Sequence, residues 1–114
     1  MRDRESTTYF VRYRDVPQPK EDFVDYYRRR HADILLQWPG IKSLILHVPA
    51  VSNDPFPVVC DCTDFLAEIV FESAEALDRA LQSKARAEAR DDFVNLKRGD
   101  VVVTHQAMRS LKLL

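Results

Sequence analysis

A histidine on the apolar side of a predicted helix is the residue of this sequence best placed for proton transfer. His31 follows Phe23 by eight residues and Tyr27 by four, so the three share one stripe of a helix that should face a sheet. An imidazole in that position can exchange a proton near neutral pH. We predict that His31 is catalytic. The competing interpretation is a core histidine whose ring is satisfied by a backbone carbonyl or by Asp64.

An aspartate at the start of a predicted strand is the second catalytic candidate. Asp64 stands beside a long loop, where its carboxylate could orient His31 or bind a substrate hydroxyl. An aspartate at a turn also caps local backbone amides, which gives Asp64 a purely structural alternative. We predict that His31 has Asp64 or a tyrosine hydroxyl within reach, directly or through water.

Aromatic residues and two further histidines are the candidates for substrate binding. Tyrosine hydroxyls could hold a substrate oxygen and aromatic rings could line a cleft, although aromatics at strand and helix spacing also form plain core. His47 and His105 lie near the exit ends of two predicted strands. The sequence has no HxH or HxxxH spacing, so we predict no metal. The predicted substrate-binding residues are Tyr9, Tyr27, Trp38, His47, Phe71 and His105.

Four strands and two helical regions must position these candidates. A β-branched and aromatic run before a proline-rich turn predicts the first strand, and three- and four-residue spacing predicts a helix that ends before Trp38-Pro39-Gly40. Ser73 is suited to cap the second helical region. The expected strands are 7–14, 41–49, 65–72 and 101–111, the helical regions are 20–37 and 74–96, and a loop covers 50–62.

The order β-α-β-β-α-β predicts an α+β fold, the ferredoxin-like split βαβ with a four-stranded antiparallel sheet and helices on one face. The other face would carry an apolar patch that a soluble monomer seldom exposes, so we predict a homodimer with two sheets face to face. In the second strand, Ile41 and Ile45 are expected on one face, opposite Leu44, Leu46 and Val48. The residues expected on the uncovered face are Val11 or Phe10, Ile45, Leu66, Val70, Val101 and Val103.

Composition excludes several classes of function. The 114 residues suit one domain, 1–114, and their 17 basic and 18 acidic side chains provide no global positive field for nucleic acid or anionic lipid. No stretch approaches the ~20 apolar residues of a membrane span, and the start lacks a secretory signal region, so we expect a cytoplasmic protein that binds neither nucleic acid nor membrane.

Cys60 and Cys62 are expected as free thiols, with a redox CxC pair as the alternative.

Three stretches carry motifs that occur in this order over most of the chain. They are residues 23–31 with the following Trp38-Pro39-Gly40-Ile41 turn, residues 64–73, and Asp92 with Phe93. They resemble the F-x-x-Y/W-x-x-x-x-H, L-P-G-L and D-G-x-A-E-x-x-F-x-S patterns of the EthD-like family in the dimeric α/β-barrel superfamily. Asp33 and Phe65 stand where that family commonly has Pro and Gly, and the bulky Phe65 would narrow a pocket next to Asp64.

The resemblance implies a dimeric α/β barrel, in which the sheets of two ferredoxin-like subunits meet and each subunit has a cleft between sheet and helices. Similar barrels include muconolactone-type isomerases, polyketide-modifying dehydratases or decarboxylases, and cofactor-free monooxygenases. The implied ligand is a small molecule. No nucleotide, serine-hydrolase or zincin motif occurs in the sequence, and no cofactor is predicted.

Two functions of different classes fit these observations. The first is a cofactor-independent enzyme of isomerase, dehydratase or monooxygenase type, in which His31 moves a proton next to a carbonyl of a small oxygenated cyclic or aromatic compound. The second is a non-catalytic small-molecule-binding or accessory dimeric scaffold protein. An open cleft beside a reachable His31 would favour the enzyme, and a cleft filled by Phe65 and Trp38 would favour the scaffold.

Overall fold

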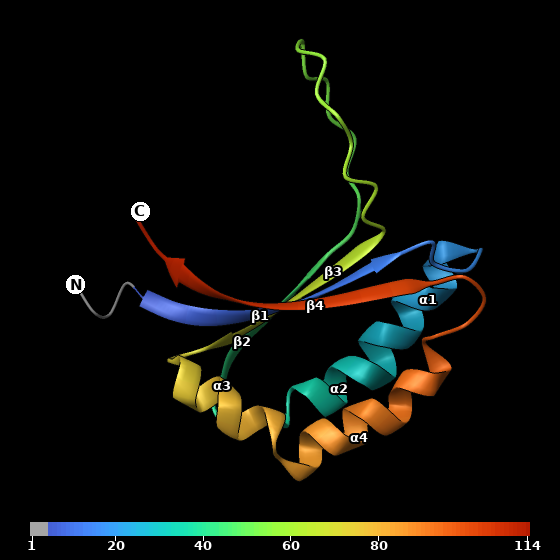
Figure 1. The fold of residues 1–114 in the computed structure, drawn as a ribbon. Coiled ribbons are helices and arrows are strands. Elements are labelled where there is room, and N and C mark those ends of the chain that lie inside the picture. Colours follow the sequence, from blue (N-terminus) through green and yellow to red (C-terminus); the bar gives the residue numbers. More distant parts are fainter. Residues whose placement is uncertain (1–4) are drawn as a thin grey trace.

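Four antiparallel strands form one sheet, and the helices cover one of its faces. The computed structural model describes residues 5–114, and the sheet has the order β2-β3-β1-β4 with every neighbouring pair antiparallel. Figure 1 shows the helices together on one side of this sheet. The predicted ferredoxin-like split βαβ fold is confirmed. The strands are β1 (Glu5–Arg14), β2 (Ile41–His47), β3 (Phe65–Phe71) and β4 (Val102–Leu111).

The first helical region contains one wide turn. α1 (Lys20–Tyr26) leads into the π-helical turn η2 (Tyr27–His31), which leads into α2 (Ala32–Leu35). The Ala32 N–H bonds to the Tyr27 carbonyl, five residues back instead of the usual four. Both Tyr27 and His31 are buried. Single π turns are rare and often occur at functional sites.

The connection from α2 to β2 depends on the Trp38-Pro39-Gly40 turn. Gly40 has a φ of +79°, in the left-handed region that favours glycine. A Cβ at this position would lie 3.9 Å from the Ala76 Cβ, an ordinary contact distance. The backbone conformation, and not a lack of space, therefore explains the glycine.

The second helical region divides into two helices. α3 (Ala74–Leu81) begins at Ser73, whose Oγ accepts a hydrogen bond from the Ala76 N–H, as predicted. Ser83 Oγ caps α4 (Lys84–Asp92) in the same way through the Arg86 N–H. A 3-10 turn, η3 (Phe93–Asn95), follows. Within residues 5–114, no helix has the length and apolarity needed to cross a membrane.

Aromatic rings fill the space between the helices and the sheet. Alternate residues of β3 are buried against the helices, which is the pattern expected of a half-buried strand. The Tyr13 ring lies edge-on to Phe23, Tyr27 and Phe65, with centroid distances of 5.2, 5.9 and 5.8 Å. Phe65 is thus a central core residue.

A β-bulge changes the predicted faces of β2. Its pairing with β3 shifts register between Ile41 and Ser43, so Ile41 packs on the core together with Leu44 and Leu46. The expectation that Ile41 and Ile45 share a face was wrong, because the bulge inserts an extra residue between them.

The helix-free face also differs from the predicted set. Val11 and Val101 are buried in the core, and Val103 packs against it, so none of the three contributes to the uncovered face. The register of the strands places there the alternate residues Phe10, Ile45, Leu66, Val70, Val102 and Met108.

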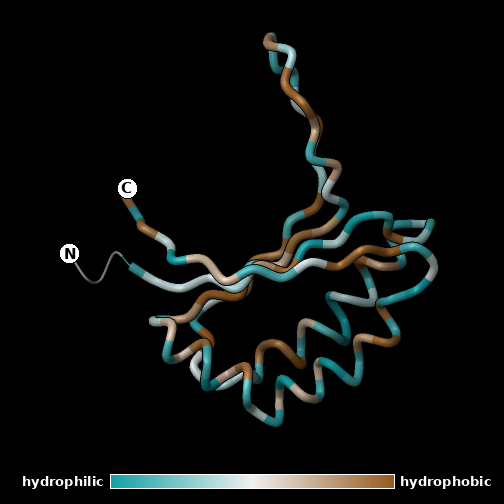
Figure 2. The backbone as a smooth tube through the Cα atoms, viewed as in Figure 1, coloured by the Kyte–Doolittle hydropathy of each residue, from teal (hydrophilic) through white to brown (hydrophobic). Residues whose placement is uncertain are grey.

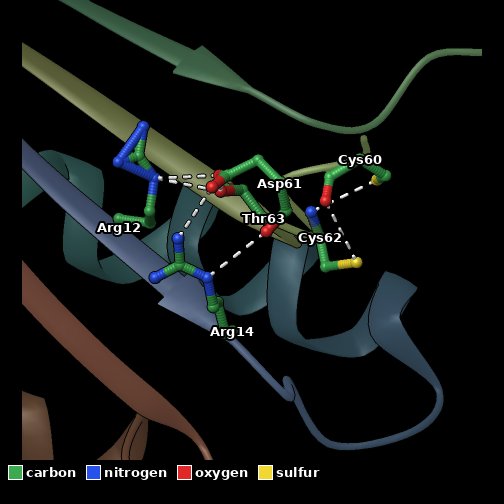
Figure 3. A network of polar contacts seen from close by, with 6 residues as sticks. All are labelled: Arg12, Arg14, Cys60, Asp61, Cys62 and Thr63. Atoms are coloured by element: carbon green, nitrogen blue, oxygen red, sulfur yellow. Dashed lines mark hydrogen bonds and ion pairs between the residues drawn. The ribbon is translucent and has the colours of Figure 1, made fainter. Parts of the chain in front are cut away.

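Residues 48–64 form an extended arm on the helix-free side of the sheet (Figure 1). Apolar positions recur along the arm (Figure 2), and Val51 and Val59 are 96% and 94% exposed. A polar network holds the base of the arm to β1 (Figure 3). In it Arg14 Nη2 donates to Asp61 Oδ1 at 3.0 Å, and Arg12 Nε donates to Thr63 Oγ1 at 2.9 Å.

The two cysteines of the arm are exposed free thiols, as predicted. Cys60 Sγ accepts a hydrogen bond from the backbone N–H of Cys62 at 3.2 Å (Figure 3). Cys62 itself has a φ of +61°, so the chain turns sharply where the arm returns to the sheet.

Candidate active site

A narrow cleft lies between the helix-covered face of the sheet and the elements η2, α2 and α4. Its volume is about 40 Å³, which is enough for water or for a small part of a ligand. His31 reaches the cleft from η2, Tyr9 from β1, His105 from β4 and Trp38 from the turn after α2. α4 adds Arg86, Ala89 and Arg90.

The imidazole of His31 is held by an aspartate that the sequence analysis did not assign to the site. His31 Nδ1 lies 2.8 Å from Asp92 Oδ2, and the His31 residue is only 5% exposed. Asp92 is the last residue of α4. Helix–helix packing of α2 against α4 therefore brings together two groups that are 61 residues apart.

Two further side chains hold the carboxylate of Asp92. Tyr26 Oη donates to Asp92 Oδ1 at 2.5 Å, and Asn95 Nδ2 donates to the same oxygen at 3.0 Å. Burial favours the neutral acid, but the hydrogen bonds from Tyr26, His31 and Asn95 outweigh burial and keep the pKa of Asp92 below its usual value. Asp92 is therefore an ionised carboxylate that only accepts hydrogen bonds.

The protonation state of His31 follows from these contacts. Burial lowers the pKa of His31 below the usual 6.5, although the hydrogen bond to Asp92 partly opposes this shift. The ring is thus neutral at pH 7, and its one proton sits on Nδ1, because the ionised Asp92 can only accept. The lone pair on Nε2 is left available as a base.

Other residues of the cleft wall offer a hydrogen-bond donor and positive charge. Trp38 is 4% exposed, and within the described residues its Nε1–H has no hydrogen-bond partner. The Tyr9 ring lies near both Trp38 and His105, with centroid distances of 6.5 and 5.7 Å. Burial lowers the pKa of His105, and the nearby charges of Arg86 and Arg90 lower it further.

Asp64 does not hold His31. Its Oδ2 accepts the Val16 N–H at 3.1 Å and its Oδ1 accepts Lys20 Nζ at 2.7 Å, and it is not part of the cleft wall. The expectation that Asp64 orients His31 was wrong, because Asp64 caps the backbone at the end of β1 where the arm rejoins the sheet. That contact is the structural alternative named for this residue.

Four of the six predicted substrate-binding residues line the cleft, namely Tyr9, Tyr27, Trp38 and His105. His47 lies on the other face of the sheet, 3.2 Å from Glu68 Oε2 through its Nε2. Phe71 is completely buried in the core, where its ring stacks on Trp38 at 6.4 Å. Among residues 5–114, no three His, Cys, Asp or Glu side chains lie close enough together to hold a metal ion.

Sequence reasoning missed the contribution of α4. Asp92 was noted only as part of a motif, and Arg86 and Arg90 were not considered. The signal was present in their spacing: residues four apart on a helix share a face, so Arg86 and Arg90 face one way, with Phe93 one turn further.

Comparison with known proteins places this chain in a family. A family model described as the EthD domain matches residues 17–96. An EthD family protein from Bacillus halodurans has the same fold, with a TM-score of 0.72 and 17% identity over 90% of this chain and 96% of its own. No curated protein matches the sequence.

Two enzymes of known class also share the fold. SnoaB, a cofactor-independent oxygenase from Streptomyces nogalater, has a TM-score of 0.58 and 15% identity over 91% of each chain. A hydroxynitrile lyase from Passiflora edulis has a TM-score of 0.61 and 17% identity over 92% of this chain and 94% of its own. At these identities the likeness concerns the fold alone.

The fold and the site define a small ferredoxin-like domain with a buried histidine–aspartate pair beside an aromatic cleft. Because the family model covers His31, Asp92 and most of the chain between β1 and β4, the chain belongs to the EthD-domain family. The resemblance of its motifs to that family is confirmed.

Proposed function

We propose that this protein is a cofactor-independent enzyme in which His31 removes a proton from a small oxygenated cyclic or aromatic compound. The observation that carries the proposal is the buried His31 on the wall of a largely aromatic cleft, with its Nδ1 held by Asp92 from outside the cleft wall. The chemistry of two enzymes with this fold, a cofactor-independent oxygenase and a hydroxynitrile lyase, is consistent with it. Isomerisation, dehydration and oxygen-dependent oxidation all begin with such a step.

The proposed step uses the free nitrogen of His31. Nε2 accepts a proton from a C–H or O–H group conjugated with a carbonyl, and the electron pair of that bond moves into the substrate as an enolate or phenolate. The imidazolium formed keeps its Nδ1–H bond to Asp92, whose negative charge stabilises it. Tyr26 and Asn95 hold Asp92 in place throughout.

The first test is a screen of the purified protein, without added metal or organic cofactor, against phenols, hydroxyquinones and unsaturated lactones. Oxygen consumption and product mass report turnover. We expect the wild type to convert at least one class and His31→Ala to lose that activity while its circular dichroism and Tm show a folded protein. Turnover that survives His31→Ala would contradict the role of His31.

A second measurement tests the proposal without a substrate. ¹⁵N NMR of the imidazole distinguishes the two neutral tautomers and the imidazolium. We expect the Nδ1–H tautomer of His31 at pH 7 and its loss in Asp92→Ala. An imidazolium at pH 7, or a neutral ring with its proton on Nε2, would remove the proposed base.

The same proposal includes a homodimer in which the helix-free faces of two sheets meet. Ile45, Val102 and Met108 are between 44% and 48% exposed on that face, and the apolar arm extends on the same side (Figure 1). Covering such surface stabilises association. Sedimentation should give a dimer at micromolar concentration, and a stable, well-folded monomer would contradict it.

The narrowness of the cleft favours a second candidate, a non-catalytic binding or accessory scaffold. About 40 Å³ is far below the several hundred Å³ of a typical ligand pocket. A scaffold would show the predicted dimer and ligand binding but no turnover in the screen. Under this alternative His31→Ala would lower the Tm and change nothing else.

A further inference from the structure

Two cations of the cleft, Arg86 and Arg90, have no acidic partner among residues 5–114. Arg86 and Arg90 lie one helical turn apart on α4 and both line the cleft. Within residues 5–114, neither guanidinium has a carboxylate within 4.0 Å. Arg86 Nη1 has only a long contact of 3.5 Å to the Leu81 carbonyl, and Arg90 lies over the Phe93 ring at 5.8 Å.

Trp38 adds a directional donor to these charges. Its Nε1–H is buried and unpartnered in the described part of the chain, whereas nearly all buried polar groups in proteins have a hydrogen-bond partner. The indole lies on the wall of the same cleft as Arg86 and Arg90. An oxygen atom of a bound molecule would satisfy this N–H.

The carboxylate that contacts His31, that of Asp92, does not line the cleft. Asp92 is engaged by Tyr26, His31 and Asn95, and it is not part of the cleft wall. Both histidines of the cleft have lowered pKa values and are neutral at pH 7. The two guanidiniums are therefore the charged groups that the cleft presents to a ligand.

We infer that this cleft binds an oxyanion, with Trp38 Nε1–H donating to its oxygen and Arg86 and Arg90 balancing its charge. The ligand class is an aromatic or cyclic phenolate or enolate, of which the charged oxygen end enters the cleft of about 40 Å³. This inference rests on the proposed function, because the anion is the species formed when His31 removes a proton. Donors and charges fixed where negative charge develops stabilise the transition state that leads to it.

The test uses 4-nitrophenol as a probe, because its phenolate and phenol absorb at different wavelengths. Trp38 is the single tryptophan of the chain, so quenching of its fluorescence reports occupancy of the cleft. With excess wild-type protein we expect the bound phenolate to be favoured over the neutral phenol by about tenfold or more. Equal affinity for the two forms, or no binding of either, would overturn the inference.

Variants assign this preference to the named groups. The double variant Arg86→Gln/Arg90→Gln should lose the preference for the phenolate, and Trp38→Phe, followed by absorbance, should weaken phenolate binding more than phenol binding. Arg79→Gln is the matched control, because Arg79 is an exposed arginine on α3 outside the cleft. A preference that survives the double variant, or that Arg79→Gln abolishes equally, would contradict the assignment.

The outcome for this anion site is separable from that of the proposed reaction. His31→Ala should retain the preference for 4-nitrophenolate, since His31 supplies no charge to it at pH 7. If the probe shows the preference but no compound is turned over, the anion site stands and the catalytic proposal fails. If turnover is found without any preference for the phenolate, the catalytic proposal stands and the anion site fails.

Discussion

Two aspartates of this protein, Asp64 and Asp92, both have lowered pKa values but differ in the groups that they contact. Asp64, at the end of the arm, is held by the Lys20 ammonium and the Val16 N–H, and these contacts lower its pKa. Asp92 is held by Tyr26 and Asn95 and accepts the Nδ1–H of His31. An ionised carboxylate is thus structural at Asp64, where it binds a backbone N–H. At Asp92 it is a positioning group, because it binds His31.

The largest effect that separates the two aspartates should be on catalysis. Asp92→Asn removes the charge behind His31 and permits the wrong tautomer, so we expect turnover of any substrate found to fall by about 10²- to 10⁴-fold. Asp64→Asn should leave the rate per folded molecule unchanged. The measurement is kcat for both variants at matched folded fractions. Equal losses of kcat in the two variants would contradict the different roles of Asp92 and Asp64.

A smaller effect should be on stability, and here the change at Asp64 is the one expected to matter. Asp64→Ala leaves the Val16 N–H without its acceptor, so we expect the free energy of unfolding to fall by about 1 kcal/mol. Lys20→Met removes only an exposed partner of Asp64 and should cost less. Urea unfolding of both variants measures this, with Arg79→Gln as the surface control. A greater loss in Lys20→Met would show that the ion pair, not the backbone cap, matters.

The smallest effect should appear as acid unfolding in two stages. The pKa of His31 is lower in the folded protein, so the unfolded chain binds its proton more tightly and stability should decline as pH falls below about 6.5. The pKa values of Asp64 and Asp92 are also lowered, and the stability they provide above about 3.8 is lost only as pH falls through their folded values.

Targeted substitutions should act on one stage at a time. His31→Gln, combined with His105→Gln because the pKa of His105 is also lowered, should abolish the decline that begins near pH 6.5. Asp64→Asn should reduce only the later stage. Unfolding free energies between pH 3 and 7 check both, and a single stage in the wild type would contradict the lowered pKa of His31.

The helix-covered side of the fold was largely predictable from the sequence, because apolar periodicity records which side of an element is buried. That periodicity placed His31 inward. It could not find Asp92, since α4 is mostly charged and has no broad apolar stripe to show which side faces α2. The His31–Asp92 contact depends on how two helices pack, which no local pattern contains.

The other differences between prediction and structure arise from local features of single residues. The bulge changes the face of Ile41, and the residues of the bulge itself, 41–43, include no glycine or proline that would indicate it. The break before α4 did have a signal, because Ser83 is as good a capping residue as Ser73. Asp64 was misassigned because a capping aspartate and a catalytic one look the same in sequence.

The wide turn η2 shows how a binding site can be altered by the length of a helix instead of by its composition. The five-residue hydrogen-bonded step from Tyr27 to Ala32 accommodates one residue more than a regular turn, which corresponds to a one-codon insertion. Deleting Arg29, an exposed residue of this turn, would allow the segment to form a regular α-helical turn with i→i+4 hydrogen bonds. The extra residue therefore widens the helix at the point where the side chains of Tyr27 and His31 are buried against the cleft.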